Sequence, residues 1–137
     1  MSVKTYNDYL RTLLQGVLCV LAYETAADYL GLTNGGYREK VQVFISEKKE
    51  LSNNIEQNYI GSLSKKEYQE VNGLLCTTAE QTIVDLLEKN GDEQIITESL
   101  ANYYEKHGQS FDSLQIPLHL KKLFQKYSEW AKVYFEE

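Results

Sequence analysis

The segment that decides the fold reads CTTAEQTIVDLLE and covers residues 76–88. Thr77 and Thr78 can each cap a helix, because a hydroxyl there accepts a hydrogen bond from a free backbone N–H of the first turn. Glu80 or Gln81 is placed to return the bond to the backbone N–H of the capping residue. Apolar residues then fall on one helical face: Ile83, Leu86 and Leu87. The segment therefore predicts the start of a buried, amphipathic helix.

From residue 77 onward the hydrophobic pattern is helical. Helices are expected over residues 77–89, 92–106 and 118–135, because apolar residues recur there every three or four positions. Asn90-Gly91 follows the first of these segments, and such residues end a helix by adopting the left-handed conformation. The second part of the chain is therefore expected to consist of three helices.

Residues 16–76 show shorter segments with the pattern of strands. Residues 17–21 are apolar and β-branched, and residues 41–45 alternate in the way that a strand with one buried face requires. Two shorter strand candidates complete the set: residues 59–63 and 71–76.

Two helices and a polar loop complete the expected architecture. Residues 4–15 and 24–30 have helical apolar spacing, and residues 46–57 are polar enough to form a loop. Strands followed by helices are typical of an α+β fold rather than a wound α/β fold. We therefore expect an α+β fold with a small sheet of three or four short strands, followed by a three-helix C-terminal part, plus a short N-terminal helix.

The composition is typical of one soluble domain. The chain has 137 residues, of which 42% are hydrophobic and 25% charged, and this size allows a core without disulfides or metal. We expect a single domain over residues 1–137, with a helical lead-in (1–15), a mixed part (16–76) and a helical part (77–137). The longest apolar run, residues 17–22, is far shorter than the roughly 20 residues of a membrane span. No membrane association and a cytoplasmic location are expected.

Negative charge concentrates in the helical part. Residues 77–137 carry six Lys or Arg against eleven Asp or Glu, which is −5 of the net charge of −6. Phosphate binding needs clustered cations, so DNA binding by this chain alone is not expected. A basic protein surface suits these acids better, and the alternative is that they only solvate helix faces. Candidate partner-binding residues are the acids Glu88, Asp92, Glu93 and Glu98, and, near the chain end, Tyr134 and Phe135, which also suit a homodimer.

Residues with catalytic or metal-binding chemistry are not grouped in the sequence. Cys19 and Cys76 lie in apolar segments and are expected to be reduced and buried. His107 and His119 lack a neighbouring Asp, Cys or Ser at a catalytic spacing, and Gly35-Gly36 lacks the pattern of a phosphate loop. We therefore expect no catalytic residue, cofactor or metal, and no enzymatic activity. Asp85, which interrupts an apolar run, is expected to fix its helix to a neighbouring loop through a hydrogen bond.

Two segments carry a resemblance to a known family. Residues 23–34 read YETAADYLGLTN, and residues 77–87 read TTAEQTIVDLL. They resemble the Ser-His-Glu-Thr-Ala-Leu-x-Leu-x-Gly-Leu-Ser and Thr-Ser-Pro-Glu-Arg-Thr-Leu-Val-Asp-Leu-Leu segments of the AbiEi-type abortive-infection antitoxins, in the same order and with similar spacing. The matching positions, for which a structural role is expected, are Glu24, Thr25, Gly31, Thr78, Glu80, Thr82 and Asp85.

The resemblance implies a non-enzymatic antitoxin of a type IV toxin–antitoxin pair. Such a protein counters a nucleotidyltransferase-like toxin in phage abortive infection, either directly or without a stable complex. Tyr23, Ala79 and Gln81 stand where the family has His, Pro and Arg. The family usually begins with a winged helix-turn-helix, for which residues 1–15 are too few. The alternative is a transcriptional regulator of a mobile-element or toxin–antitoxin operon, acting through DNA or as a co-repressor.

Overall fold

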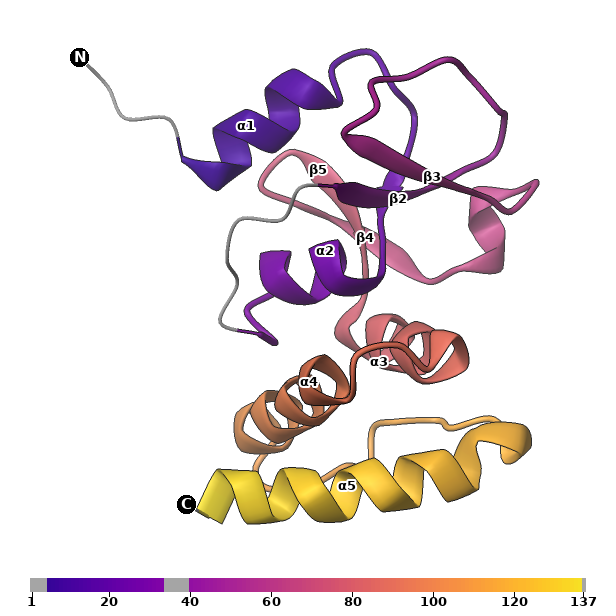
Figure 1. Ribbon diagram of the computed structural model, residues 1–137. Helices are drawn as coiled ribbons and strands as arrows, with labels where there is room; N and C mark the ends of the chain where they lie inside the picture. The colour runs from indigo at the N-terminus through magenta and orange to yellow at the C-terminus, as the bar shows by residue number, and fades with distance from the viewer. Residues whose placement is uncertain (1–4, 34–39, 137) are drawn as a thin grey trace.

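The computed structural model describes residues 5–33 and 40–136, and the side chains of residues 134–136 fall outside that description. Its architecture is α+β, as predicted from the sequence. Within the described residues, five α-helices accompany one mixed sheet of five strands. The sheet forms one end of the molecule, and three successive helices are stacked at the other end (Figure 1).

The sheet has a short strand at its centre. Its strands are β1 (Val20–Leu21), β2 (Val41–Ile45), β3 (Ile55–Tyr59), β4 (Tyr68–Val71) and β5 (Leu74–Thr77), in the spatial order β3-β2-β1-β5-β4. The central strand β1 pairs antiparallel with β2 and parallel with β5. On the outside, β3 is parallel to β2, and β4 is antiparallel to β5. The sheet is therefore mixed, with β3 and β4 at its two edges.

The sheet has more strands than the three or four predicted. Residues 46–57 were expected to be a loop, but their last part belongs to β3, whose polar sequence Ile-Glu-Gln-Asn-Tyr is held by continuous pairing with β2. The candidate strand at residues 71–76 is instead a hairpin. Asn72 and Gly73 form its turn with φ of 51° and 87°, a conformation that these two residue types tolerate well.

Helix α3 (Ala79–Lys89) begins at one of the two capping residues that the sequence indicates. The hydroxyl of Thr78 accepts a hydrogen bond from the backbone of Gln81 and starts this helix. Asp92 caps α4 (Glu93–Lys106) in the same way. After a 3-10 turn, η2 (Leu118–Leu120), the chain continues as α5 (Lys121–Glu136). None of the described helices is both long enough and apolar enough to span a membrane.

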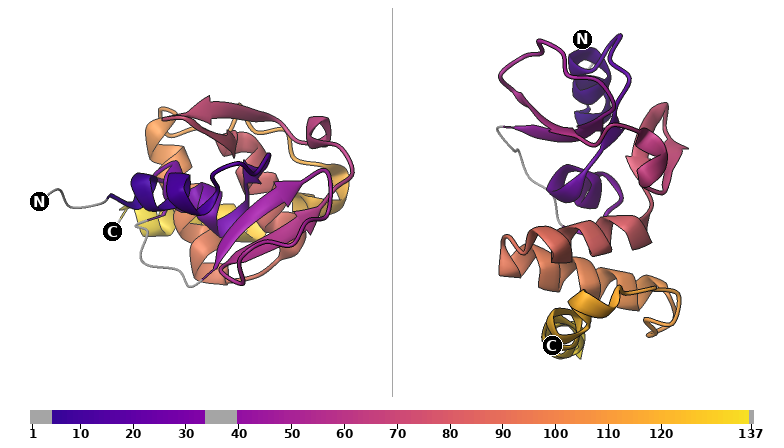
Figure 2. Two further views of the ribbon diagram at one scale, coloured as in Figure 1. Left: turned by 90° about the horizontal axis from the view of Figure 1, so that it is seen from above. Right: turned by 90° about the vertical axis from the view of Figure 1, so that its right-hand side faces the viewer.

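Two hydrophobic cores share one short helix. The first lies where α1 (Tyr6–Leu13) covers the sheet and includes Leu10, while the second lies among α3, α4 and α5 and includes Leu100. Between them lies α2 (Tyr23–Tyr29), seen between the sheet and α3 and α4 in Figures 1 and 2. Ala26 of α2 belongs to the first core and Ala27 to the second. Neighbouring small residues of α2 therefore join the two ends of the molecule.

Both cysteines lie in the first core. Cys19 and Cys76 are free and buried, as expected from their apolar segments. Burial raises the pKa of the Cys19 thiol to about 11. It raises the pKa of the Cys76 thiol to about 12. Both thiols are therefore protonated at neutral pH and act as apolar packing groups.

Candidate functional site

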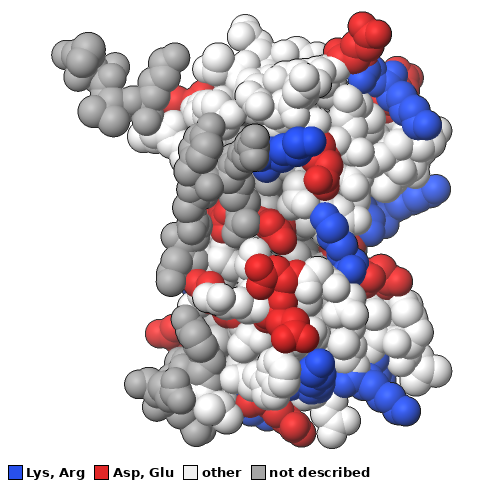
Figure 3. All heavy atoms as spheres, in the orientation of Figure 1, with Lys and Arg blue, Asp and Glu red and all other residues white. Residues whose placement is uncertain are grey.

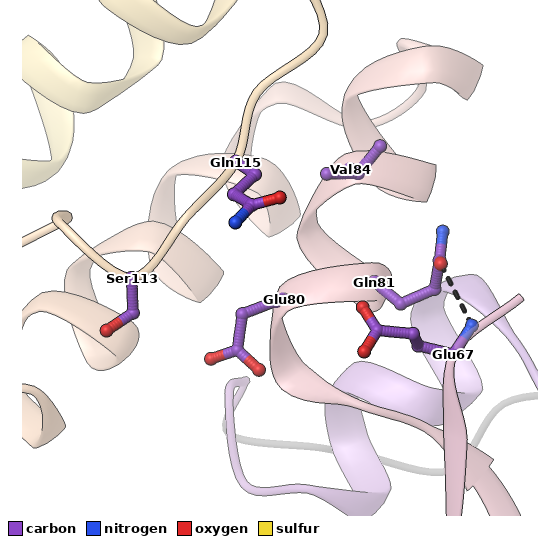
Figure 4. A pocket seen from close by; sticks show the side chains of 6 residues that line it. All are labelled: Glu67, Glu80, Gln81, Val84, Ser113 and Gln115. Atoms are coloured by element: carbon purple, nitrogen blue, oxygen red, sulfur yellow. Dashed lines mark hydrogen bonds between the residues drawn. The ribbon is translucent and has the colours of Figure 1, made fainter.

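A polar pocket opens beside the first turns of α3. It has a volume of about 570 Å³ and lies between α3, the chain that enters β4, and the segment that leads to η2 (Figure 4). Its lining comes from these three parts of the chain: Glu67, Glu80, Gln81, Val84, Ser113 and Gln115. In Figure 4 the carboxylates of Glu67 and Glu80 point toward the same space, and the amide of Gln115 lies above it. The pocket therefore offers mainly hydrogen-bond acceptors to a ligand.

Glu80 is held at the wall of this pocket by Tyr103 of α4 and by His107, which follows the end of α4. The hydroxyl of Tyr103 donates to Oε2 of Glu80 over 2.8 Å, and Nε2 of His107 lies 3.8 Å from the same oxygen. The ring of His107 stacks on that of Tyr103 with centroids 3.7 Å apart. Among the described residues, nothing hydrogen-bonds to Oε1 of Glu80. One oxygen is thus fixed by the protein itself, and the other remains available to a ligand.

The buried ring of Tyr103 keeps its proton throughout the physiological range. Its pKa is raised to about 12, first by burial and then by its hydrogen bond to Glu80. Tyr103 is therefore a permanent donor to Glu80 at neutral pH. This fixed donor orients the Glu80 carboxylate without consuming its second oxygen.

Gln81 connects the pocket to the edge of the sheet. Its Oε1 accepts a hydrogen bond from the backbone N–H of Glu67 over 3.0 Å, which Figure 4 marks, and its Nε2 donates to Oδ1 of Asp85 over 3.0 Å. The reciprocal bond from Glu80 or Gln81 to the helix cap, predicted from the sequence, is therefore wrong. The side chains of Glu80 and Gln81 instead bond to residues outside α3. Of the predicted cap, only the hydrogen bond from the backbone N–H of Gln81 to the Thr78 hydroxyl is present.

Asp85 makes the hydrogen bond to a neighbouring loop that the sequence predicts. The loop residue is Lys66, which follows the 3-10 turn η1 (Leu63–Lys65) and places Nζ 2.7 Å from Oδ1 of Asp85. The Asp85 side chain is only 2% exposed, and its buried Oδ2 has no hydrogen-bond partner among the described residues. Burial raises the pKa of this carboxyl, although Lys66 acts in the opposite direction. Asp85 is thus enclosed by the fold.

The other matching positions of the family resemblance have structural contacts. The hydroxyl of Thr25 accepts a hydrogen bond from the buried backbone N–H of Gln42 over 2.9 Å. Thr82 lies 2.7 Å from the hydroxyl of Thr77. Gly31 has a φ of 74° directly after α2, a conformation that favours glycine. Glu24 lies in the first turn of α2, and its backbone N–H donates to the side chain of Gln42. These residues lock α2 and α3 onto the sheet.

Tyr23, which stands where the family has His, has an unusual backbone. Its φ is 48°, which is uncommon for an aromatic residue. Its ring packs against Phe44 with centroids 5.2 Å apart, and Nζ of Lys89 lies 4.6 Å from the ring centre. Burial, followed by the nearby Asp85 carboxylate, raises the pKa of the Tyr23 hydroxyl. These contacts hold the strained first residue of α2 in place.

The four predicted acidic contacts do not form one free surface. Glu98 is buried, with 9% of its surface exposed. Asp92 is used as the cap of α4. Oε2 of Glu88 lies 2.8 Å from Nε2 of His119, and Oε1 of Glu93 lies 3.8 Å from Nζ of Lys126. Tyr134 and Phe135 belong to the last turn of α5, and their side chains lie outside the described residues.

The sequence did not indicate most of the pocket. The motif indicated only a structural role for Glu80, and Glu67, Ser113 and Gln115 come from segments without a recognisable pattern. His107 appeared to lack an acidic neighbour, because Glu80 lies far from it along the chain and approaches only when α4 packs beside α3. Within the part of the chain that the structure describes, no group of three His, Cys, Asp or Glu side chains is placed to hold a metal ion. The arrangement suits recognition of a guanidinium or ammonium group, whose N–H donors match its acceptors.

No protein-family model matches this chain, and no curated protein shows significant similarity to it. The resemblance to the antitoxins therefore rests on the two sequence segments.

Proposed function

We propose that this chain is a non-enzymatic, antitoxin-like protein that counters a nucleotidyltransferase-type toxin in phage abortive infection. The observation that supports the proposal most directly is the position of the 77–87 segment. This segment bears the resemblance, and three of its residues line the acidic pocket: Glu80, Gln81 and Val84.

Charge complementarity gives this pocket a physical role. An enzyme that handles nucleotides and nucleic acid binds phosphates through Lys and Arg side chains. Glu67 and Glu80 present carboxylates to such cations, and the helical part of the chain adds a net charge of −5, from six basic against eleven acidic residues. Complementary charge steers two proteins together and excludes other partners. The pocket therefore replaces the predicted surface at Glu88, Asp92, Glu93 and Glu98 as the preferred contact.

Growth of cells that express the open reading frame neighbouring the gene of this chain, with and without the chain, tests the proposal. Co-expression of the wild-type chain should restore growth, and the double variant Glu67→Gln/Glu80→Gln should restore it at least tenfold less well. Glu105→Gln/Glu129→Gln removes two equally charged, exposed carboxylates away from the pocket and should protect fully. Undiminished protection by the pocket variant would exclude this contact, and no protection by the wild type would exclude the antitoxin role.

The regulator remains the second proposal, and one feature of α5 favours it. Trp130 is 45% exposed, and Nζ of Lys126 lies 5.0 Å from the centre of its ring, so a basic and aromatic patch is present. Glu93 partly neutralises this patch. On the face drawn in Figure 3, acidic and basic side chains alternate and no broad basic surface appears. Salt-dependent, operator-specific retardation of DNA by the purified chain would support the regulator and count against the antitoxin.

A further inference from the structure

We infer that the outer edge of β4 and the adjoining acidic pocket together bind an extended, basic segment of a partner protein, which adds to the sheet as a sixth strand. The inference rests on the proposed protein-binding role and specifies how the partner is held. It is independent of whether the partner is a toxin.

The hydrogen-bond pattern leaves the outer side of β4 open. The backbone N–H of Thr78 donates to the carbonyl of Glu67 over 3.1 Å. The backbone N–H and C=O groups of Glu67 are therefore on the side of β4 that faces β5. Residues alternate along a strand, and Tyr68 and Glu70 therefore direct their N–H and C=O groups away from β5. Both residues are exposed, and β4 is the last strand of the sheet. Among the described residues, nothing pairs with the outward backbone groups of Tyr68 and Glu70, so these groups are presented to a partner.

At the opposite edge of the sheet, one side chain of β3 contacts the protein's own chain. The side-chain amide of Gln57 in β3 pairs with the backbone of Lys49, donating over 2.9 Å and accepting over 3.4 Å. No equivalent contact among the described residues covers β4, which also contains neither Lys nor Pro. Natural proteins limit pairing at an edge with charged residues, proline or a short strand, and β4 has only its four-residue length and the acidic Glu70. An acidic edge repels another acidic strand but attracts a basic one, so β4 is suited to the addition of a basic strand.

The hairpin that carries this edge is firmly held. Tyr29 donates its hydroxyl to the carbonyl of Val71 over 2.7 Å, and a guanidinium N–H of Arg11 donates to the carbonyl of Asn72 over 2.5 Å. The hairpin tip is thus tied to α2 and α1. A partner strand would meet a preformed edge, so it would not have to bear the cost of ordering it.

The pocket supplies specificity at the start of the same edge. Glu67 directly precedes β4 and lines the pocket, so a strand added to β4 passes it at one end. A Lys or Arg side chain there would lie between the carboxylates of Glu67 and Glu80, and Gln115 adds an acceptor. None of the described residues that line the pocket is a cation.

The same charges disfavour a second copy of this chain as the occupant. Pairing of two β4 edges would bring Glu67 and Glu70 of both copies to one seam, and like charges across a strand pair are destabilising. A nucleic acid would meet the same repulsion from its phosphates. An extended segment with a terminal basic residue satisfies both the backbone edge and the carboxylates.

The test uses the complete chain and a capped seven-residue peptide of alternating threonine and valine that ends in arginine. Amide exchange followed by NMR should show the N–H groups of Tyr68 and Glu70 exchanging at least tenfold more slowly at saturating peptide. Replacement of the arginine by citrulline, or the substitution Glu67→Gln, should weaken binding at least fivefold. Glu105→Gln is the matched control and should bind as the wild type does.

A peptide with alternate amides methylated separates strand addition from simple charge attraction. It keeps the arginine but cannot pair with an edge, and it should neither bind nor protect the two amides. Equal binding of this peptide would overturn the inference, as would protection at β3 or protection of the β4 amides by self-association without peptide. Because these measurements require no toxin, failure of the strand-addition inference is distinguishable from failure of the growth experiment.

Discussion

Two carboxylates of α3, those of Asp85 and Glu80, differ in their exposure and in their hydrogen bonds. Asp85 is enclosed and holds Lys66, while Glu80 is fixed through one oxygen and leaves the other at a pocket. The Glu80 side chain is 36% exposed, whereas that of Asp85 is 2% exposed. Asp85 therefore serves the structure of the protein itself, and Glu80 has acceptor capacity left for another molecule. Substitutions at the partners of each carboxylate separate these two roles.

The largest effect is expected from removal of the Asp85 counter-charge. Lys66→Met leaves the buried carboxylate without its ion pair and should lower the free energy of unfolding by about 3 kcal/mol at neutral pH. Lys65→Met, which removes an exposed neighbouring charge, should change it by less than about 0.5 kcal/mol. Urea unfolding monitored by circular dichroism measures both. An equal loss of unfolding free energy in Lys66→Met and Lys65→Met would show that the ion pair of Lys66 with Asp85 does not stabilise the fold.

The pH dependence of stability should report Asp85 directly. Its folded-state pKa is raised by burial, so the folded protein binds its proton more tightly than the unfolded chain. The resulting stabilisation of the folded state is complete below the pKa of Asp85 in the unfolded chain, about 3.9. It is lost as the pH rises through the higher pKa of Asp85 in the folded protein. The stability of Asp85→Asn should therefore rise relative to the wild type from about pH 4 to pH 7, by less than the Lys66→Met effect. A constant difference over this range would contradict the raised pKa.

A smaller effect is expected from Tyr103→Phe, which removes the fixed donor of Glu80. The loss of one hydrogen bond should cost about 1 kcal/mol, because water can replace it at the pocket. Spectroscopic titration of the tyrosines should also lose the step near pH 12. Tyr59→Phe, at an exposed tyrosine, should leave both quantities unchanged. Retention of the high-pH step would assign it to another tyrosine.

The smallest effect on stability is expected at the open side of the pocket. Glu67→Gln keeps the backbone bond to Gln81 and should change the free energy of unfolding by less than about 0.5 kcal/mol. Scanning calorimetry of the variant measures the change in unfolding free energy, and titration calorimetry measures its weakened binding of the peptide. A loss of stability as large as that of Tyr103→Phe would mean that the Glu67 carboxylate also holds the fold together.

Local signals in the sequence predicted the helices and the role of Asp85. Thr78 caps α3 as predicted, because a cap and its first turn are neighbours in the chain, and the same local signal was present but unused at Asp92 before α4. An acid inside an apolar run requires a buried partner, and Lys66 is that partner. These features could be predicted because each depends on a short stretch of chain or on the cost of burying one charge.

Features that depend on distant segments could not be predicted in the same way. The polar strand β3 exists only because β2 lies beside it. The hairpin turn at Asn72-Gly73 lies within residues 71–76, which the sequence pattern predicted to be a single strand. The pocket joins Glu67, Glu80 and the segment before η2, which become neighbours only in the folded chain. The predicted capping contacts of Glu80 and Gln81 were wrong for the same reason, since tertiary partners competed for both side chains.

The two-residue strand β1 determines when a nascent chain can fold. One of its neighbours, β2, is synthesised soon afterwards, but the other, β5, emerges from the ribosome only after β3 and β4. Until Cys76 is available, Leu21 lacks its parallel partner and the core that contains Leu10 is incomplete. Such long-range closure favours late folding. A ribosome-bound chain that ends before β5 should therefore remain sensitive to protease, and one that extends well past α3 should acquire resistance.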